Sequence, residues 1–139
     1  MKPALLQLSS PFFSKVLYVL AIYFFLKGHN QPGGGFIAGL MVASALMLNM
    51  LAFGTGKVRK SLYLAPIQLV IVGIFIALFS AILPMFWGLN FFTALWLPEF
   101  SLPLIGQLHI GSPLLFDLGV FLSVIGFTVS VIFDLENAQ

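Results

Sequence analysis

The chain changes direction at a nine-residue polar stretch between two long apolar segments, Gly28-His29-Asn30-Gln31-Pro32-Gly33-Gly34-Gly35-Phe36. Gly28 follows an apolar run, where a helix commonly ends with a left-handed glycine. Pro32 cannot continue a helix, because it lacks an amide donor and clashes with the preceding turn. Each of the three consecutive glycines costs about 1 kcal/mol relative to alanine within a helix. They indicate backbone freedom or close approach by another element, so the stretch predicts a tight corner that serves as a docking point.

The composition is that of an integral membrane protein. Of 139 residues, 60% are hydrophobic and 7% are charged, whereas soluble domains carry roughly 25% charged residues. Six basic and four acidic residues give a net charge of +2, which is too small for a nucleic-acid surface. Cysteine is absent, which excludes disulfides, thiolate catalysis and thiolate metal sites.

Four apolar segments are long enough to cross a bilayer, which takes about 20 helical residues. The uncharged stretch from Ser61 to Pro98 is too long for one span and too short for two. Pro84 and Gly88 are therefore expected to end the third span. The sequence predicts an all-α membrane protein with a single four-span domain over 1–139 and a long apolar loop between the third and fourth spans. The expected spans are residues 8–27, 33–53, 62–86 and 112–133.

Small residues recur at helical spacing in three of these spans, and in the third span they are Gly73, Ala77 and Ala81. Gly35, Gly39 and Ala43 are four residues apart in the second span, and such a ridge lets helix backbones approach closely in lipid. That face is expected to contact protein.

In the fourth span, a stripe of small residues that includes Gly119 and Gly126 lies nearly opposite Asp117 at about 100° per residue. Neither side suits lipid. Since four helices offer little material to cover both sides, this pattern indicates a larger assembly. Ser112 followed by Pro113 is the expected start of the span, with the serine as its N-cap.

The distribution of lysine and arginine predicts the orientation. Cytoplasmic loops of membrane proteins carry an excess of these residues. An arrangement with both termini in the cytoplasm places only Lys27 outside. The residues it places on the cytoplasmic side are Lys2, Lys15, Lys57, Arg59 and Lys60.

The corner motif resembles the signature of a known family. The string Gly28-His29-Asn30-x-Pro32-Gly33-Gly34-Gly35-Phe36, followed by Gly39, is similar to that of the B subunit of Mrp-type (multiple resistance and pH) cation/proton antiporters. Chain length, four spans and the Phe116–Val120 run fit the same family, so the resemblance covers most of the chain.

The resemblance implies an accessory membrane subunit of a multi-subunit Na+/H+ antiporter in a prokaryotic plasma membrane. Its implied partners are the lipid bilayer, small membrane subunits and large ion-translocating subunits related to the membrane arm of respiratory complex I. The chain would help to assemble the complex and would close part of a path for Na+ and H+. No cofactor is expected. The residues expected to form the motif and subunit contacts are Gly28, Asn30, Pro32, Gly33, Gly34, Gly35, Phe36 and Gly39.

Three ionisable residues are candidates for the ion path or its gating. Asp117 lies about 8 Å below the start of its helix, where it either exchanges ions or protons or stabilises the first turn of the helix. His29 titrates near neutrality, or else it only hydrogen-bonds the corner. Lys15 either pairs with an acid, including Asp134 or Glu136, or extends its ammonium to the interface.

The sequence provides no basis for an enzyme. The glycines lack the lysine of a phosphate-binding loop, the two histidines are far apart, and no hydrolase motif is present. Three other functions remain open. One is a membrane-arm subunit of an energy-converting hydrogenase, and another is a structural scaffold. The third is a self-sufficient four-helix exporter. The absence of an acidic residue in the first span counts against it.

Overall fold

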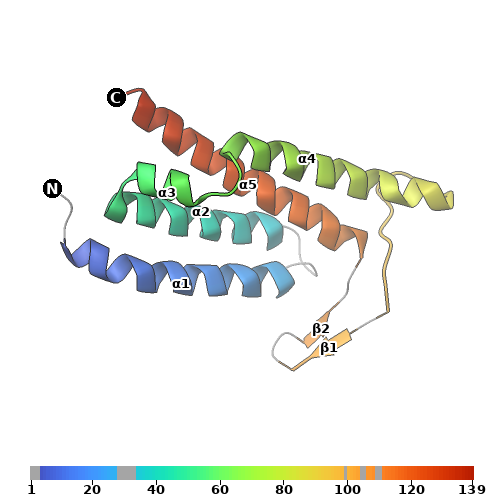
Figure 1. Ribbon diagram of the computed structural model, residues 1–139. Helices are drawn as coiled ribbons and strands as arrows, with labels where there is room; N and C mark the ends of the chain where they lie inside the picture. Colours follow the sequence, from blue (N-terminus) through green and yellow to red (C-terminus); the bar gives the residue numbers. More distant parts are fainter. Residues whose placement is uncertain (1–3, 28–33, 99, 104–105, 109–110) are drawn as a thin grey trace.

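Four long helices dominate the computed structural model, which describes residues 4–27, 34–98, 100–103, 106–108 and 111–139 (Figure 1). Between them lie two shorter helices and a small hairpin. The helices are α1 (Ala4–Lys27), α2 (Gly34–Phe53), α3 (Thr55–Ser61), α4 (Pro66–Ile82), the 3-10 helix η2 (Leu83–Trp87) and α5 (Ser112–Asn137), and the strands are β1 (Phe100–Leu102) and β2 (Gly106–Leu108).

The prediction of a four-span helical membrane protein is confirmed. The segments long and apolar enough to cross a membrane are Ala4–Lys27, Gly34–Phe53, Pro66–Trp87 and Ser112–Asn137. The first begins earlier than expected and continues through Pro11. The fourth extends beyond residue 133 to Asn137.

The third span begins at Pro66 rather than at residue 62. The backbone of Leu62 and Ala65 is extended, and Pro66 then occupies the first turn of α4, where its missing amide costs no hydrogen bond. Residues Thr55–Ser61, which lie between the expected second and third spans, form the separate basic helix α3. Gly54 separates it from α2 with a φ of 95°, and its amide donates to the Met50 carbonyl at 2.8 Å.

The long helices form a row in the order α1, α2, α5, α4 (Figure 1). The closest packing joins α4 to α5, α1 to α2, and α2 to α5. Helix α5 thus has neighbours from its own chain on two sides. Because the arrangement is a row and not a closed bundle, many large apolar side chains remain exposed, among them Leu8 at 80%, Phe75 at 68% and Phe127 at 65%. In a membrane these faces contact lipid or other proteins.

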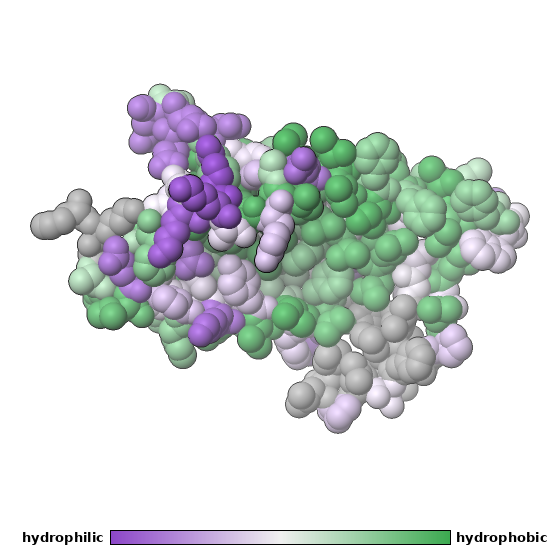
Figure 2. All heavy atoms as spheres, viewed as in Figure 1, coloured by the Kyte–Doolittle hydropathy of each residue, from purple (hydrophilic) through white to green (hydrophobic). Residues whose placement is uncertain are grey.

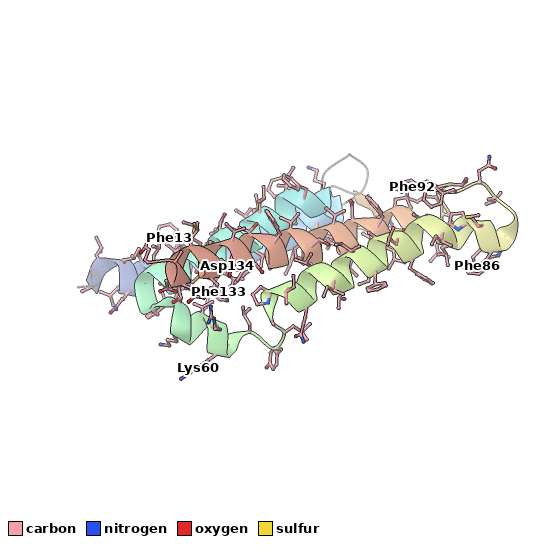
Figure 3. The ribbon with its side chains drawn as sticks, turned by 90° about the horizontal axis from the view of Figure 1, so that it is seen from above. Phe13, Lys60, Phe86, Phe92, Phe133 and Asp134 are labelled. Carbon is pink, nitrogen blue, oxygen red and sulfur yellow. The ribbon has the colours of Figure 1, made fainter. Side chains whose placement is uncertain are left out.

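The apolar core lies at the end of the row that holds α3. Val58 of α3 packs there against Met50, Ile125, Val129 and Phe133. Figure 3 shows Phe133 and Asp134 at this end of α5. In Figure 2 the hydrophilic side chains gather at the same end, whereas the middle of this face is apolar. The polar end and the apolar middle match a helix row that crosses a bilayer.

The connection between the third and fourth spans folds back on the helices. Helix α4 continues into η2, which contains Pro84. Gly88 follows η2 as its C-cap, with a left-handed φ of 73°. The predicted break is therefore confirmed. The Phe92 amide then donates to the Ala81 carbonyl at 3.1 Å, and the Phe92 ring lies 5.1 Å from that of Phe116. These contacts fix the start of the connection against α4 and α5.

A short antiparallel hairpin that was not predicted follows in this connection. Its strands β1 and β2 pair residue 100 with residue 108 and residue 102 with residue 106. Outside the hairpin, an isolated antiparallel bridge joins Trp96 to Gly111. The hairpin lies at the end of the row where α1 ends and α2 and α5 begin (Figure 1).

Ser112 does not cap its own helix, contrary to expectation. The N-cap of α5 is Gly111, and no side chain bonds the cap. The Ser112 hydroxyl instead accepts from the Leu95 amide at 3.0 Å, and its carbonyl accepts from the Ser80 hydroxyl at 2.6 Å. These bonds connect the start of α5 to α4 and to the loop. The Ser112 hydroxyl thus bonds the loop and does not cap its own helix.

Candidate functional site

Helix α2 crosses α5 directly after the glycine corner. Gly35 is buried against the backbone of Asp117, and a Cβ at this position would collide with the Asp117 carbonyl oxygen. One turn later, a Cβ on Gly39 would lie 3.0 Å from the Phe121 carbonyl oxygen and 3.0 Å from the Val124 Cβ. The predicted small-residue ridge therefore does contact protein. The contact seen is with α5 of the same chain, and it brings Gly35 to the level of Asp117.

The opposite side of α5 packs on α4 through glycines from both helices. A Cβ on Gly119 would lie 2.5 Å from the Gly73 carbonyl oxygen, and one on Gly126 would lie 2.5 Å from the Pro66 carbonyl oxygen. Ser123 belongs to the same stripe and bonds back to the Gly119 carbonyl at 2.9 Å. Both sides of α5 are thus covered by α2 and α4. The prediction that both sides of α5 contact protein is therefore confirmed, and the row shows that helices of the same chain supply these contacts although little material for them was expected.

Asp117 lies on the side of α5 that faces α2. Its residue is partly buried, and it is the sixth residue of a helix that begins at Ser112. The helix N-terminus carries a partial positive charge that favours a carboxylate within the first turn, and this influence weakens with depth. Asp117 therefore combines an intramembrane position with a backbone that packs closely against Gly35 of α2, and an ionisable residue within a span is a candidate for a functional role.

Phe36 points away from the ridge that Gly35 and Gly39 form. Its side chain is 50% exposed and lines an apolar groove of about 600 Å³ together with Phe92, Phe116 and residues of α4. The phenylalanine of the motif therefore joins α2 to the loop and to the start of α5.

Lys15 lies far from Asp117. Its neighbour Ser14 donates to the Asn49 side chain at 3.1 Å and to the Ala45 carbonyl at 3.4 Å. Asn49 and Gly35 are separated by about 20 Å along α2 at about 1.5 Å per residue. The structure thus places two of the predicted ionisable candidates near opposite ends of α2, and no single site contains both.

The remaining candidates fall outside the described residues. These are Gly28, His29, Asn30, Pro32 and Gly33. Gly34, by contrast, is the first residue of α2 and is buried. Within the described ranges, no three histidine or acidic residues group as they would around a metal ion.

Sequence reasoning missed a polar seam between α1 and α2. Besides the Ser14 bonds, the Gln7 amide donates to the Ala52 carbonyl at 3.0 Å, and Tyr18 hydrogen-bonds Asn49. The signal was present, because Gln7, Ser14 and Tyr18 recur at helical spacing on one face of α1. Hydrogen bonds between spans stabilise helix pairs in lipid, so the seam fixes how α1 lies on α2.

The chain is similar along most of its length to proteins of one described family. Residues 5–130 match the family "Domain related to MnhB subunit of Na+/H+ antiporter". Over 124 residues the chain is 39% identical to a Staphylococcus aureus (strain Newman) protein named "Putative antiporter subunit mnhB2", covering 89% of this chain and 87% of that protein. The relative of the same name from strain JH1 gives the same identity and coverage.

A solved structure shares the fold. The chain superposes with a TM-score of 0.76 and 24% identity on part of a chain in the "Structure of Mrp complex from Dietzia sp. DQ12-45-1b". The match covers 94% of this chain and 14% of that longer chain. This likeness supports the row of four spans described above.

Proposed function

The chain belongs to the family of domains related to the MnhB subunit of Na+/H+ antiporters, and on this premise we propose that it is an accessory membrane subunit of a multi-subunit Na+/H+ antiporter in a prokaryotic plasma membrane. The similarity to an antiporter subunit over 89% of the chain carries this proposal. It acts as part of a transporter and not as an enzyme. Residues 1–139 form a single four-span domain in this proposal.

The packing supports an accessory role. Helix α5 is fixed between α2 and α4 by glycine contacts that leave no room for a side chain, so these three helices form a rigid unit. The exposed apolar faces on either side of the row require lipid or partner helices. The partners are the other membrane subunits of the antiporter. Two rival interpretations lose support: the hydrogenase subunit because the named relatives are antiporter subunits, and the exporter because the first span carries Lys15 and no acid.

The proposed contribution to ion movement is centred on Asp117 and the corner. Gly35 brings the motif against the Asp117 backbone, and Phe36 lines the adjacent groove. His29, in the same motif, is a second candidate for the path. Lys15 is a separate candidate at the other end of the membrane. In this proposal the chain closes one side of an ion path whose main relay lies in the large subunits.

Replacing Asp117 by asparagine tests this contribution. Asn keeps the shape and the acceptor of the side chain but removes its charge. If Asp117 changes its charge or ligation during turnover, Asp117→Asn will lower Na+-driven proton movement at least severalfold or shift its pH profile. The measurement uses everted vesicles in which complex content is checked by blot.

Asp134→Asn is the matched control. Asp134 lies on the same helix but is exposed, so the same change there should leave the rate and the pH profile unchanged. A wild-type rate and pH profile in Asp117→Asn would make Asp117 a structural group at the start of α5, since Asn and Asp stabilise helix ends about equally well.

The proposed orientation places both termini and α3 in the cytoplasm. The chain has no natural cysteine, so single cysteines report sidedness directly. Gly56→Cys lies on α3 with open space around it, and Ala94→Cys lies in the exposed loop after η2. A membrane-impermeant maleimide should label Ala94→Cys in intact cells and Gly56→Cys only after permeabilisation. The reverse pattern would contradict the orientation.

The assembly is tested by isolating the complex through a tag on this chain. Intact-mass analysis after mild detergent extraction should find the chain together with the large and small antiporter subunits. Recovery of the chain alone, or with hydrogenase subunits, would contradict the proposed function.

A further inference from the structure

A recess lies where α3 folds back over the end of the α1–α2 seam. It has a volume of about 340 Å³, and residues of α1, α2 and α3 line it. Its polar lining includes Lys15, Lys57, Ser14, Tyr18 and Ser61. None of the nine described residues that form its wall is acidic. The recess therefore holds two cationic side chains without an acidic residue in its wall.

The ammonium of Lys57 is held at this recess by its surroundings. Its Nζ lies 4.6 Å from the centroid of the Phe53 ring, and Phe53 itself forms part of the wall. A cation above an aromatic face is stabilised there. Lys15 reaches the same recess from α1. Two cations that line one recess without an acidic residue in its wall favour an anion as the occupant.

The position of the recess indicates that the anion belongs to a lipid headgroup. Phe53 is the last residue of the apolar helix α2, and α3, with three cations in seven residues, follows directly. The recess is thus at the boundary between hydrocarbon and headgroups. Its wall is also partly apolar, through Pro11, Phe53 and Val58, as contact with the glycerol and upper acyl region requires. Basic pockets between spans on the cytoplasmic side bind anionic headgroups.

We propose that this recess is a binding site for the phosphate of an anionic phospholipid in the cytoplasmic leaflet, with Lys15 and Lys57 as its cationic ligands. The hydroxyl groups of Ser14 and Ser61 lie in the same wall, but they donate to Asn49 and to the Val58 carbonyl, so the two ammonium groups carry the recognition of the phosphate. The bound lipid joins α1 to α3, which links the first span to the basic end of the row. The side of the membrane follows from the orientation proposed above, whereas binding itself does not depend on antiport activity.

The test uses a photoactivatable phosphatidylglycerol in membranes that contain the complete complex, and it measures the crosslink to peptides of α1 and α3. The variant Lys15→Gln with Lys57→Gln should lower the crosslink at least about tenfold, which corresponds to 1.4 kcal/mol. The matched control is Lys27→Gln with Lys60→Gln, which removes the same charge outside the recess. Figure 3 shows Lys60 directed away from the body of the protein. This control should retain the crosslink within about twofold, and arginine at positions 15 and 57 should restore it.

Competition in the wild-type complex keeps the proposal testable if the double variant is not recovered. Unlabelled phosphatidylglycerol should displace the probe, whereas phosphatidylcholine and millimolar inorganic phosphate should not. Displacement by inorganic phosphate would identify a site for the free anion and overturn the lipid assignment. Equal labelling by a phosphatidylcholine probe, or an unchanged crosslink in the double variant, would also overturn it.

Discussion

Replacing Gly119 by leucine will abolish accumulation of the folded subunit. A Cβ at this position would lie 2.5 Å from the Gly73 carbonyl oxygen and 2.7 Å from the Ala77 amide nitrogen. Both are backbone atoms, so relief requires α4 and α5 to separate along their whole contact. Overpacking of a core costs about 1 to 3 kcal/mol when the neighbouring side chains can move aside. Here the clashing atoms belong to the backbone, so a shift of side chains cannot relieve the clash. The measurement is the amount of subunit in isolated membranes and in the purified complex.

Gly56→Leu provides the control for this prediction. Gly56 lies on α3, and nothing lies within 4 Å of a Cβ placed there. The same substitution should therefore leave the amount of subunit unchanged. Normal recovery of the Gly119→Leu complex would show that α4 and α5 do not pack as described.

The second large effect is expected at the crossing of α2 and α5, where two glycines of one ridge should differ in their tolerance of alanine. At Gly35 the three atoms nearest to the added methyl all belong to the backbone of Asp117, whereas at Gly39 two of the three nearest atoms belong to the Val124 side chain. A side chain can shift by a few tenths of an ångström more readily than a helix backbone. Gly35→Ala should lower subunit recovery strongly, by about 1 to 3 kcal/mol of stability, and Gly39→Ala only mildly.

Thermal stability of the purified complex, followed by the loss of this subunit on size exclusion, measures the difference. An equal effect of the two alanine variants would argue against the register between α2 and α5. Since Gly35 contacts Asp117, loss of exchange in Gly35→Ala is interpretable only after correction for complex content.

The sequence predicted the four spans because apolar length is a local property of the chain. The break at Pro84 and the end of α2 at Gly54 were predictable for the same reason, since proline and glycine act on their own backbone. The helix α3 was not predicted, because seven residues with three cations resemble a loop in sequence. The packing of Val58 against residues of α2 and α5 could not be read from the sequence. The hairpin after η2 also depends on pairing between residues that are apart in sequence.

Helical spacing identified the faces of α2 and α5 that contact protein, but it could not identify their partners. Gly35 and Gly39 were assigned to subunit contacts, and the structure places α5 of the same chain against them. The stripe that contains Gly119 likewise meets α4. Periodicity defines a face on one helix, and only the order of helices in space decides what covers it.

The candidate site was predictable in part. Asp117 was found from its charge within an apolar span, and the structure adds its contact with the Gly35 ridge. Lys15 was found in the same way, yet it lies near the far end of α2, beside Asn49. The position of a charge along its own helix does not show which part of a neighbouring helix lies beside it. The sequence therefore could not show that Asp117 and Lys15 lie near opposite ends of α2.

The most direct test of the proposed function is Na+-driven proton movement in everted vesicles from cells whose antiporter lacks only this chain. Vesicles without it should show exchange at background level, and restoring the chain in trans should recover both exchange and the intact complex. The remaining subunits are quantified by blot in each sample. Wild-type exchange by a complex that assembles without this chain would contradict its role as a required subunit of the antiporter.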